Sequence, residues 1–214
     1  MIKKSLIFSI LLVSMLFSGT AINAEEVNET PVEIPQEIDE ELTQELMDIA
    51  NSTPIEMDKG QLTRAGYGSY PRRKGVILVT DDKFKGIIPT GHSAIVYSSN
   101  YVVEALDSGV KRGNNNWAAT KSQVYGVGVK ATTVAQDERA ANWCYNQIGK
   151  PYNWNFYRMD YRGSFYCSHL IRSAFLDLYG IDLNTGDYDG LGAKAIHPME
   201  LVNTSKTSLI YRKK

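Results

Sequence analysis

The hydrophobic pattern of this chain changes its period near Thr132, and this change constrains the fold more than any other feature of the sequence. Before it, short runs of β-branched and aromatic residues are separated by turn residues, which is typical of strands. After it, apolar residues recur at helical spacing. Strands followed by helices predict an α+β domain, in which an antiparallel sheet or small barrel packs against helices.

The expected elements can be placed in order along the chain. The strands are expected at 75–80, 90–97, 101–106 and 125–130, with a short strand beginning at Val110 and loops at 51–72 and 113–116. Helices are expected at 137–149 and from Cys167 to Gly180, followed by a short helix at 197–201 and a last strand at 208–211. Ser98-Ser99-Asn100 is expected to close a hairpin between the second and third strands.

The first 24 residues have the three-part layout of a secretory signal peptide. A basic start (1–4) precedes an apolar run (5–17) and a small, polar stretch that ends at Ala24, where cleavage is expected. The apolar run is shorter than the ~20 residues that a membrane span requires. We therefore expect a secreted or cell-wall associated protein with no stable membrane anchor after cleavage.

Charge is distributed unevenly along the chain. Residues 25–58 hold 12 Asp and Glu and no Lys or Arg, whereas residues 59–214 hold 21 Lys and Arg against 12 acids. We divide the mature chain into an acidic extension (25–73), with one amphipathic helix at 36–50, and a catalytic domain (74–214). The extension is interpreted as a docked helix or a removable pro-segment. The basic domain favours an anionic cell-wall polymer as partner, and nucleic acid is not expected because no recognition motif is present.

Cys167 is the first candidate for chemistry. It precedes an apolar helical run at the point where unpaired N–H groups and the positive end of the helix dipole lower a thiol pKa. The alternative is a buried cysteine that packs as a small hydrophobe. A nucleophilic cysteine also requires a base.

His92 and Glu104 are the candidate base and its orienting partner. His92 begins an apolar strand, and Glu104 is a carboxylate inside another. If Tyr97 lies opposite Tyr101, both side chains share one face of the hairpin, whereas a turn one residue shorter would separate them. A surface histidine and an exposed edge-strand glutamate are the alternatives.

Metal and disulfide chemistry compete for the same residues. Cys144, Cys167, His169 and His197 lack the close paired spacing of zinc sites, so no metal or other cofactor is expected. A disulfide between Cys144 and Cys167 is permitted outside the cytosol, and it would favour a structural secreted protein.

Several short motifs together resemble one enzyme superfamily. Gly149-Lys150-Pro151-Tyr152-Asn153-Trp154 before Tyr166-Cys167-Ser168 resembles the signature of NlpC-type cell-wall cysteine peptidases. The histidine strand (91–96) precedes the cysteine, as in the circularly permuted papain-like amidases of the YiiX-like group. This resemblance covers roughly residues 74–202. Tyr166 departs from the common pattern, which has glycines and an aspartate before the cysteine.

The resemblance implies a permuted papain-like α+β fold with Cys167 as nucleophile, His92 as base and Glu104 as the third residue. It implies a secreted thiol hydrolase that cleaves an amide bond, with cell-wall peptide as the substrate class. Tyr152, Trp154 and Tyr166 are expected to line the substrate site, with packing in the core as the alternative. A hydrolase or acyltransferase on lipid or N-acyl substrates, and a non-catalytic binding module, are the alternatives.

Overall fold

The computed structural model describes residues 66–82, 91–189 and 194–213 of the 214-residue chain. The predicted signal peptide (1–24) and the helix predicted at 36–50 lie outside these residues. In the part that is described, no helix is long and apolar enough to cross a membrane.

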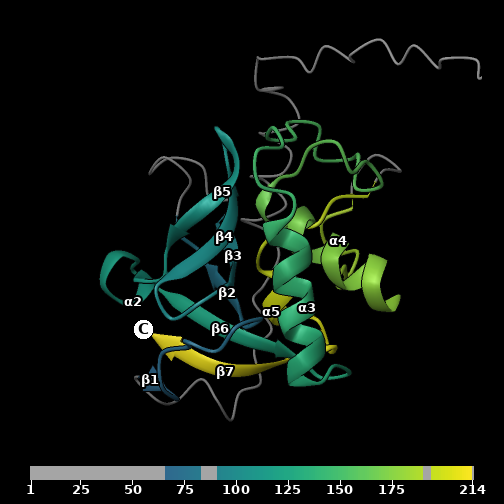
Figure 1. Ribbon diagram of the computed structural model, residues 1–214. Helices are drawn as coiled ribbons and strands as arrows, with labels where there is room; N and C mark the ends of the chain where they lie inside the picture. The colour runs from purple at the N-terminus through teal and green to yellow at the C-terminus, as the bar shows by residue number, and fades with distance from the viewer. Residues whose placement is uncertain (1–65, 83–90, 190–193, 214) are drawn as a thin grey trace, which may run out of the picture. The chain divides into compact units, whose positions relative to one another are not determined.

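The described residues form one seven-stranded antiparallel sheet with a few helices (Figure 1). The strands are β1 (Gly66–Tyr67), β2 (Ile77–Thr80), β3 (His92–Val96), β4 (Tyr101–Leu106), β5 (Gly109–Asn114), β6 (Val124–Val129) and β7 (Thr207–Lys213). The helices are α2 (Trp117–Thr120), α3 (Val134–Tyr145), α4 (Cys167–Tyr179) and α5 (Glu200–Asn203). The strand order is β1-β7-β6-β2-β3-β4-β5, and the predicted α+β class is confirmed.

Alternation along the central strands gives the sheet two apolar faces. On one face, Ile77 and Ile95 belong to a core that includes buried residues of α3, α4 and α5. On the other face, Leu78 and Ala94 pack in a smaller cluster with Trp117 of α2. Figure 1 shows α3 and α4 on one side of the strands and α2 on the other.

The β3–β4 hairpin has the predicted register. Tyr97 N–H donates to the Tyr101 carbonyl at 2.9 Å, and Ala94 lies opposite Glu104. Residues two apart on a strand share a face, so His92 and Glu104 are diagonal neighbours on the face that carries Ala94. The three-residue turn therefore fixes which face receives the two side chains.

Helix α4 begins at Cys167 and ends at Tyr179, and Gly180 is its C-cap, which confirms the predicted start and stop. Its inner face consists of apolar side chains that are fully buried: Leu170, Ile171, Ala174 and Phe175. Gly180 has a φ of 67°, a left-handed conformation that glycine adopts without a steric penalty. The buried face holds the start of the helix, and hence Cys167, against β3 and β4.

Helix α3 begins and ends earlier than the predicted 137–149. A capping box starts it, in which Thr133 and Gln136 satisfy each other's backbone N–H groups. The helix ends at Tyr145. Ile148, which lies within the predicted helix, is 39% exposed, because it lies beyond the observed helix in a turn.

Two segments predicted as loops contain strands. Gly66 and Tyr67, within the predicted loop at 51–72, pair with β7, so the sheet begins before the expected domain boundary at Lys74. Strand β5 continues to Asn114, within the predicted loop at 113–116. Sequence periodicity is weak in both segments because each is an edge strand with few apolar residues.

Candidate active site

The structure joins His92 and Glu104 directly. His92 Nε2 lies 2.7 Å from Glu104 Oε2, and the two side chains are 12% and 11% exposed. Gly91, with a φ of 65°, turns the chain into β3 and places His92 at the strand's first position. Because Glu104 engages Nε2, Nδ1 is the ring nitrogen left for another partner.

That partner is the thiol of Cys167, at the first position of α4. Burial would raise the pKa of the Cys167 thiol, but hydrogen bonding to His92, the charge of the imidazole and hydrogen bonds from Ser93 lower it below its ordinary value. Cys167 is 7% exposed. Specific partners therefore oppose the effect of burial and favour the thiolate form of Cys167.

The pKa of the His92 imidazole shifts in the opposite direction to that of the Cys167 thiol. Burial would lower the pKa of His92, but hydrogen bonds and charge interactions with Cys167 and Glu104 raise it to about 9. Opposite shifts in two contacting groups favour the thiolate–imidazolium pair over the neutral pair. The carboxylate of Glu104 contributes to this preference because it stabilises the imidazolium.

Two residues that the sequence analysis missed complete the surroundings. Ser93 is fully buried on the helix face of β3, and its hydroxyl has no hydrogen-bond partner except the thiol. Trp117 stacks on His92, with ring centroids 5.5 Å apart and an interplanar angle of 29°. An aromatic face over an imidazole favours its cationic form. In the sequence, the position of Ser93 directly after His92 is a feature that could indicate a role at the site. No such feature marks Trp117.

Trp117 is held in place by the segment before β2. Its backbone N–H donates to the Tyr70 hydroxyl at 3.0 Å, and that hydroxyl donates to Asn115 Oδ1 at 2.7 Å. The Asn115 amide in turn donates to the Pro71 carbonyl at 3.2 Å. Residues before the expected domain boundary therefore support the position of the imidazole.

The three aromatic residues expected at the substrate site differ in placement. Tyr152 and Trp154 are half-buried, with ring centroids 4.5 Å apart. The pKa of Tyr152 is raised well above its ordinary value by burial and then by the charge of Cys167. Tyr152 therefore lies within the electrostatic reach of the thiolate.

Tyr166 is 3% exposed. Its hydroxyl donates to the Phe156 carbonyl at 3.1 Å and accepts from the Ile196 N–H at 3.1 Å. This placement leaves little surface for a substrate, contrary to the expectation from sequence. The ring instead fixes the residue that precedes Cys167.

The alternative roles for the cysteines and histidines find no support in the described residues. Cys144 and Cys167 are free thiols, and Cys144 Sγ lies 3.8 Å from the Leu170 carbonyl. Within residues 66–82, 91–189 and 194–213, no group of three or more His, Cys, Asp and Glu could hold a metal ion.

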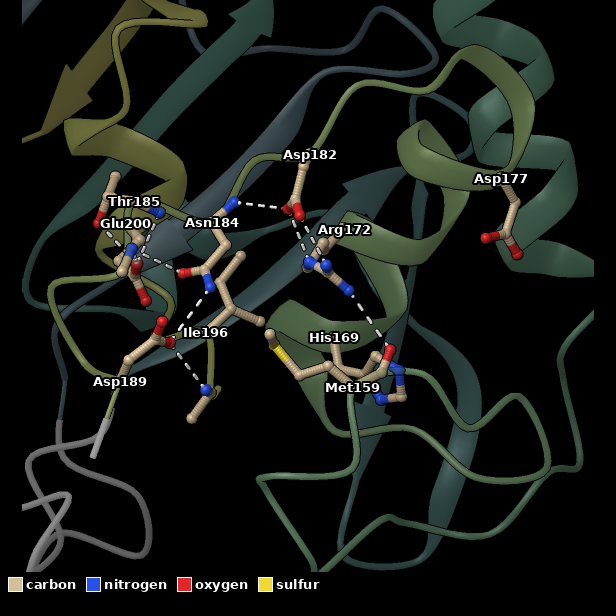
Figure 2. Close-up of polar contacts among 12 residues, drawn as sticks. Met159, His169, Arg172, Asp177, Asp182, Asn184, Thr185, Asp189, Ile196 and Glu200 are labelled. Carbon is tan, nitrogen blue, oxygen red and sulfur yellow. Dashed lines mark hydrogen bonds and ion pairs between the residues drawn. The ribbon is translucent and has the colours of Figure 1, made fainter. Parts of the chain in front are cut away.

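Polar contacts join Arg172 of α4 to the segments beside it (Figure 2). Arg172 donates through Nε and Nη2 to the carboxylate of Asp182, both at 2.7 Å, and through Nη1 to the Met159 carbonyl at 3.3 Å. Nearby, the buried carboxylate of Glu200 accepts from the N–H groups of Thr185 and His197. These contacts fix the loops that flank α4.

An antiparallel sheet packed on the start of a buried helix, with a thiol, an imidazole and a carboxylate meeting there, defines a papain-like protein. The chain belongs to the family of permuted papain-like amidases, YaeF/YiiX, C92, whose model matches residues 75–207. Members of this family are described as amidase enzymes, which are hydrolases.

Two individual proteins are similar to this chain in sequence or in fold. The chain is 30% identical over 143 residues to the uncharacterized protein YycO of Bacillus subtilis (strain 168). The match covers 64% of this chain, which spans 55% of the length of YycO. The fold is similar to the crystal structure of metalloprotein YiiX from Escherichia coli O157:H7, with a TM-score of 0.51 and 16% identity over 66% of this chain and 97% of that one.

Proposed function

We propose that this protein is a secreted thiol hydrolase that cleaves an amide bond through an acyl-enzyme. Cys167 is the nucleophile, His92 moves the proton and Glu104 orients His92. The observation that carries the proposal is the 2.7 Å contact between His92 Nε2 and Glu104 Oε2, beside a thiol at the first turn of a buried helix. The family's amidase activity supports the reaction class.

Acylation follows from this geometry. The Cys167 thiolate attacks the amide carbonyl carbon, and the oxygen of the tetrahedral intermediate takes up the negative charge. In the proposed mechanism, the backbone N–H of Cys167, which has no partner within the helix, donates to this oxygen. His92 then protonates the departing nitrogen, the C–N bond breaks, and an amine and a thioester are formed.

Deacylation reverses the role of the imidazole. Neutral His92 takes a proton from a water molecule as that water attacks the thioester carbonyl. The C–S bond breaks, which releases a carboxylic acid and restores the thiolate–imidazolium pair. Glu104 holds the ring throughout and stabilises its charge.

Cell-wall peptide is the substrate class that we propose. The predicted signal peptide supports a location outside the cytoplasm, and the excess of basic residues in 59–214 favours anionic wall polymers. Tyr152, whose pKa is raised by burial and then by the charge of Cys167, contacts Trp154, and we propose that both half-buried rings contact the substrate.

The test is hydrolysis of purified peptidoglycan stem peptides by the wild-type protein and the Cys167→Ala variant. Release of new primary amines, with product masses that locate the cleaved bond, is expected from the wild type alone. N-acyl amino acids and lipid esters assayed in parallel separate the alternative substrate classes. Equal hydrolysis by the variant would overturn the proposal, and inactivity on all substrates with an ordinary thiol would favour a binding module.

A further inference from the structure

Gly113 of β5 lies against the carboxylate of Glu104. Gly113 is opposite Val102 in the β4–β5 ladder, and Glu104 is opposite Lys111. Residue 113 therefore shares a face with Val102 and Glu104. A Cβ atom at residue 113 would overlap Glu104 Oε1 and lie 2.8 Å from its Cδ, which shows that the glutamate side chain extends diagonally over the glycine.

Backbone conformation does not explain this glycine. Gly113 is absent from the glycines with positive φ, and it lies inside a regular strand, where any L-residue is allowed. Glycine in a strand interior weakens the strand and is often found where another group approaches closely. Here the approaching group is the Glu104 carboxylate.

The surroundings leave the carboxylate few alternatives. On the sheet face that carries Glu104, Ala94, Val96 and Val102 are fully buried, Lys111 lies opposite on β5, and Trp117 stacks on the imidazole. A carboxylate in such a setting is stable only where it meets a donor. The space above Gly113 allows the glutamate to lie flat along the sheet and to present Oε2 to His92.

We propose that Gly113 is a positioning residue of the active site, whose missing side chain makes the space that holds Glu104 against His92. This rests on the proposed function, in which Glu104 orients the imidazole. It assigns a role to a residue that makes no contact with the thiol.

The proposal predicts separate effects on stability and on the site. In Gly113→Ala, the overlap falls on the end of the Glu104 side chain, so the carboxylate moves while the backbone fold is retained. Alanine restricts the unfolded chain more than glycine does, but the displaced buried carboxylate loses its donor, and this second effect should lower the melting temperature. The displaced carboxylate no longer stabilises the imidazolium, and the pKa of His92 should fall by about one unit or more, a tenfold change in its proton affinity.

The experiment measures the His92 pKa by NMR titration, assigned with His92→Ala, and the pH profile of Cys167 alkylation by iodoacetamide. Gly113→Ala should lower the first and shift the second to higher pH. In a Glu104→Ala background the same substitution should change neither, because contacting residues couple and the partner is then absent. Gly128→Ala, whose Cβ would meet Ile210 Cδ1 at 3.0 Å and Arg73 Nη2 at 3.9 Å and no atom of Glu104 among its three nearest, is the matched control.

Three results would overturn the inference: an unchanged His92 pKa in Gly113→Ala, an equal change in the Glu104→Ala background, or an equal change in Gly128→Ala. If Gly113→Ala does not fold, Gly113→Ala/Glu104→Ala must regain the melting temperature of Glu104→Ala, and failure to do so also overturns it. A wild-type protein with an ordinary thiol, whose His92 pKa still falls in Gly113→Ala, would contradict the proposed function and leave the positioning role intact.

Discussion

Helix α4 borders two buried regions that each contain a cysteine and a histidine, and the two regions behave oppositely. At its first turn, the pKa of Cys167 is lowered and that of His92 is raised to about 9. On other sides of the helix, burial raises the pKa of Cys144 of α3, and burial together with the charge of Arg162 lowers the pKa of His169 to about 3.

The difference lies in the partners of these groups. All four side chains are largely buried, and burial alone disfavours both thiolate and imidazolium. Cys144 has a backbone carbonyl beside it, and His169 has the Arg162 guanidinium 3.4 Å from its Nε2. Only at the start of the helix do a thiol, an imidazole and a carboxylate meet, so only there are the charged forms favoured.

The largest effect is expected from the two cysteines. Cys167→Ala should reduce hydrolysis at least about 10⁴-fold, as loss of a nucleophile does, with a melting temperature near that of the wild type. Cys144→Ala should retain activity and lose about 1–2 kcal/mol of unfolding free energy, because it leaves a small cavity between α3 and α4. Steady-state rates and thermal unfolding of both variants give the comparison, and a reversed pattern would contradict it.

The next effect concerns the carboxylate. Glu104→Gln retains the size of the side chain but removes the charge that stabilises imidazolium. We expect hydrolysis to fall roughly 10²-fold or more, within the range of acid–base catalysis, and the His92 pKa to fall below about 9. NMR titration measures the second quantity, and an unshifted pKa would show that Glu104 does not support His92.

The region that contains His169 should affect how the free energy of unfolding depends on pH. The pKa of His169 is about 3 in the folded protein against about 6.5 when unfolded, so only the unfolded state binds the proton between these values. Stability from this group is present above pH 6.5 and is lost as the pH falls toward 3. Relative to His169→Gln, the wild type should lose up to about 1.4 kcal/mol per pH unit below pH 6. Urea unfolding at several pH values measures this, and parallel curves would contradict it.

The smallest effect is expected at two tyrosines. Tyr152→Phe should reduce hydrolysis about 2- to 10-fold, the usual weight of one hydrogen bond, without loss of stability. Tyr166→Phe is its control. Removal of the hydroxyl between Phe156 and Ile196 should cost about 1–3 kcal/mol of stability, because buried partners lose a hydrogen bond. If Tyr152→Phe lost stability alone, its proposed contact with substrate would be wrong.

Much of the frame of the site was predictable because local patterns specify it. The apolar spacing after Cys167 and the glycine at residue 180 define α4. The hairpin turn at 98–100 sets the parity that places His92 and Glu104 on one face. In both cases, the residues that decide the outcome are neighbours in sequence, so periodicity and turn chemistry reveal them.

The remaining features depend on contacts between distant segments. Trp117 reaches His92 because Tyr70 and Asn115 hold α2 in place, and none of these residues has a local signature. In the sequence, Gly113 has the pattern of a loop glycine. The Glu104 carboxylate that explains it belongs to another strand, so no local pattern reveals the contact. The early start of α3 is different. The capping box at Thr133 and Gln136 is a local signal, so this helix start was predictable from the sequence.

The most direct test of the central claim, that Cys167 and His92 form a thiolate–imidazolium pair, is the pH dependence of Cys167 alkylation by iodoacetamide in the wild type and in His92→Ala. The account predicts rapid labelling of the wild type well below the ordinary thiol pKa of about 8.5, lost in the variant. Slow labelling with the same ordinary profile in both proteins would contradict it.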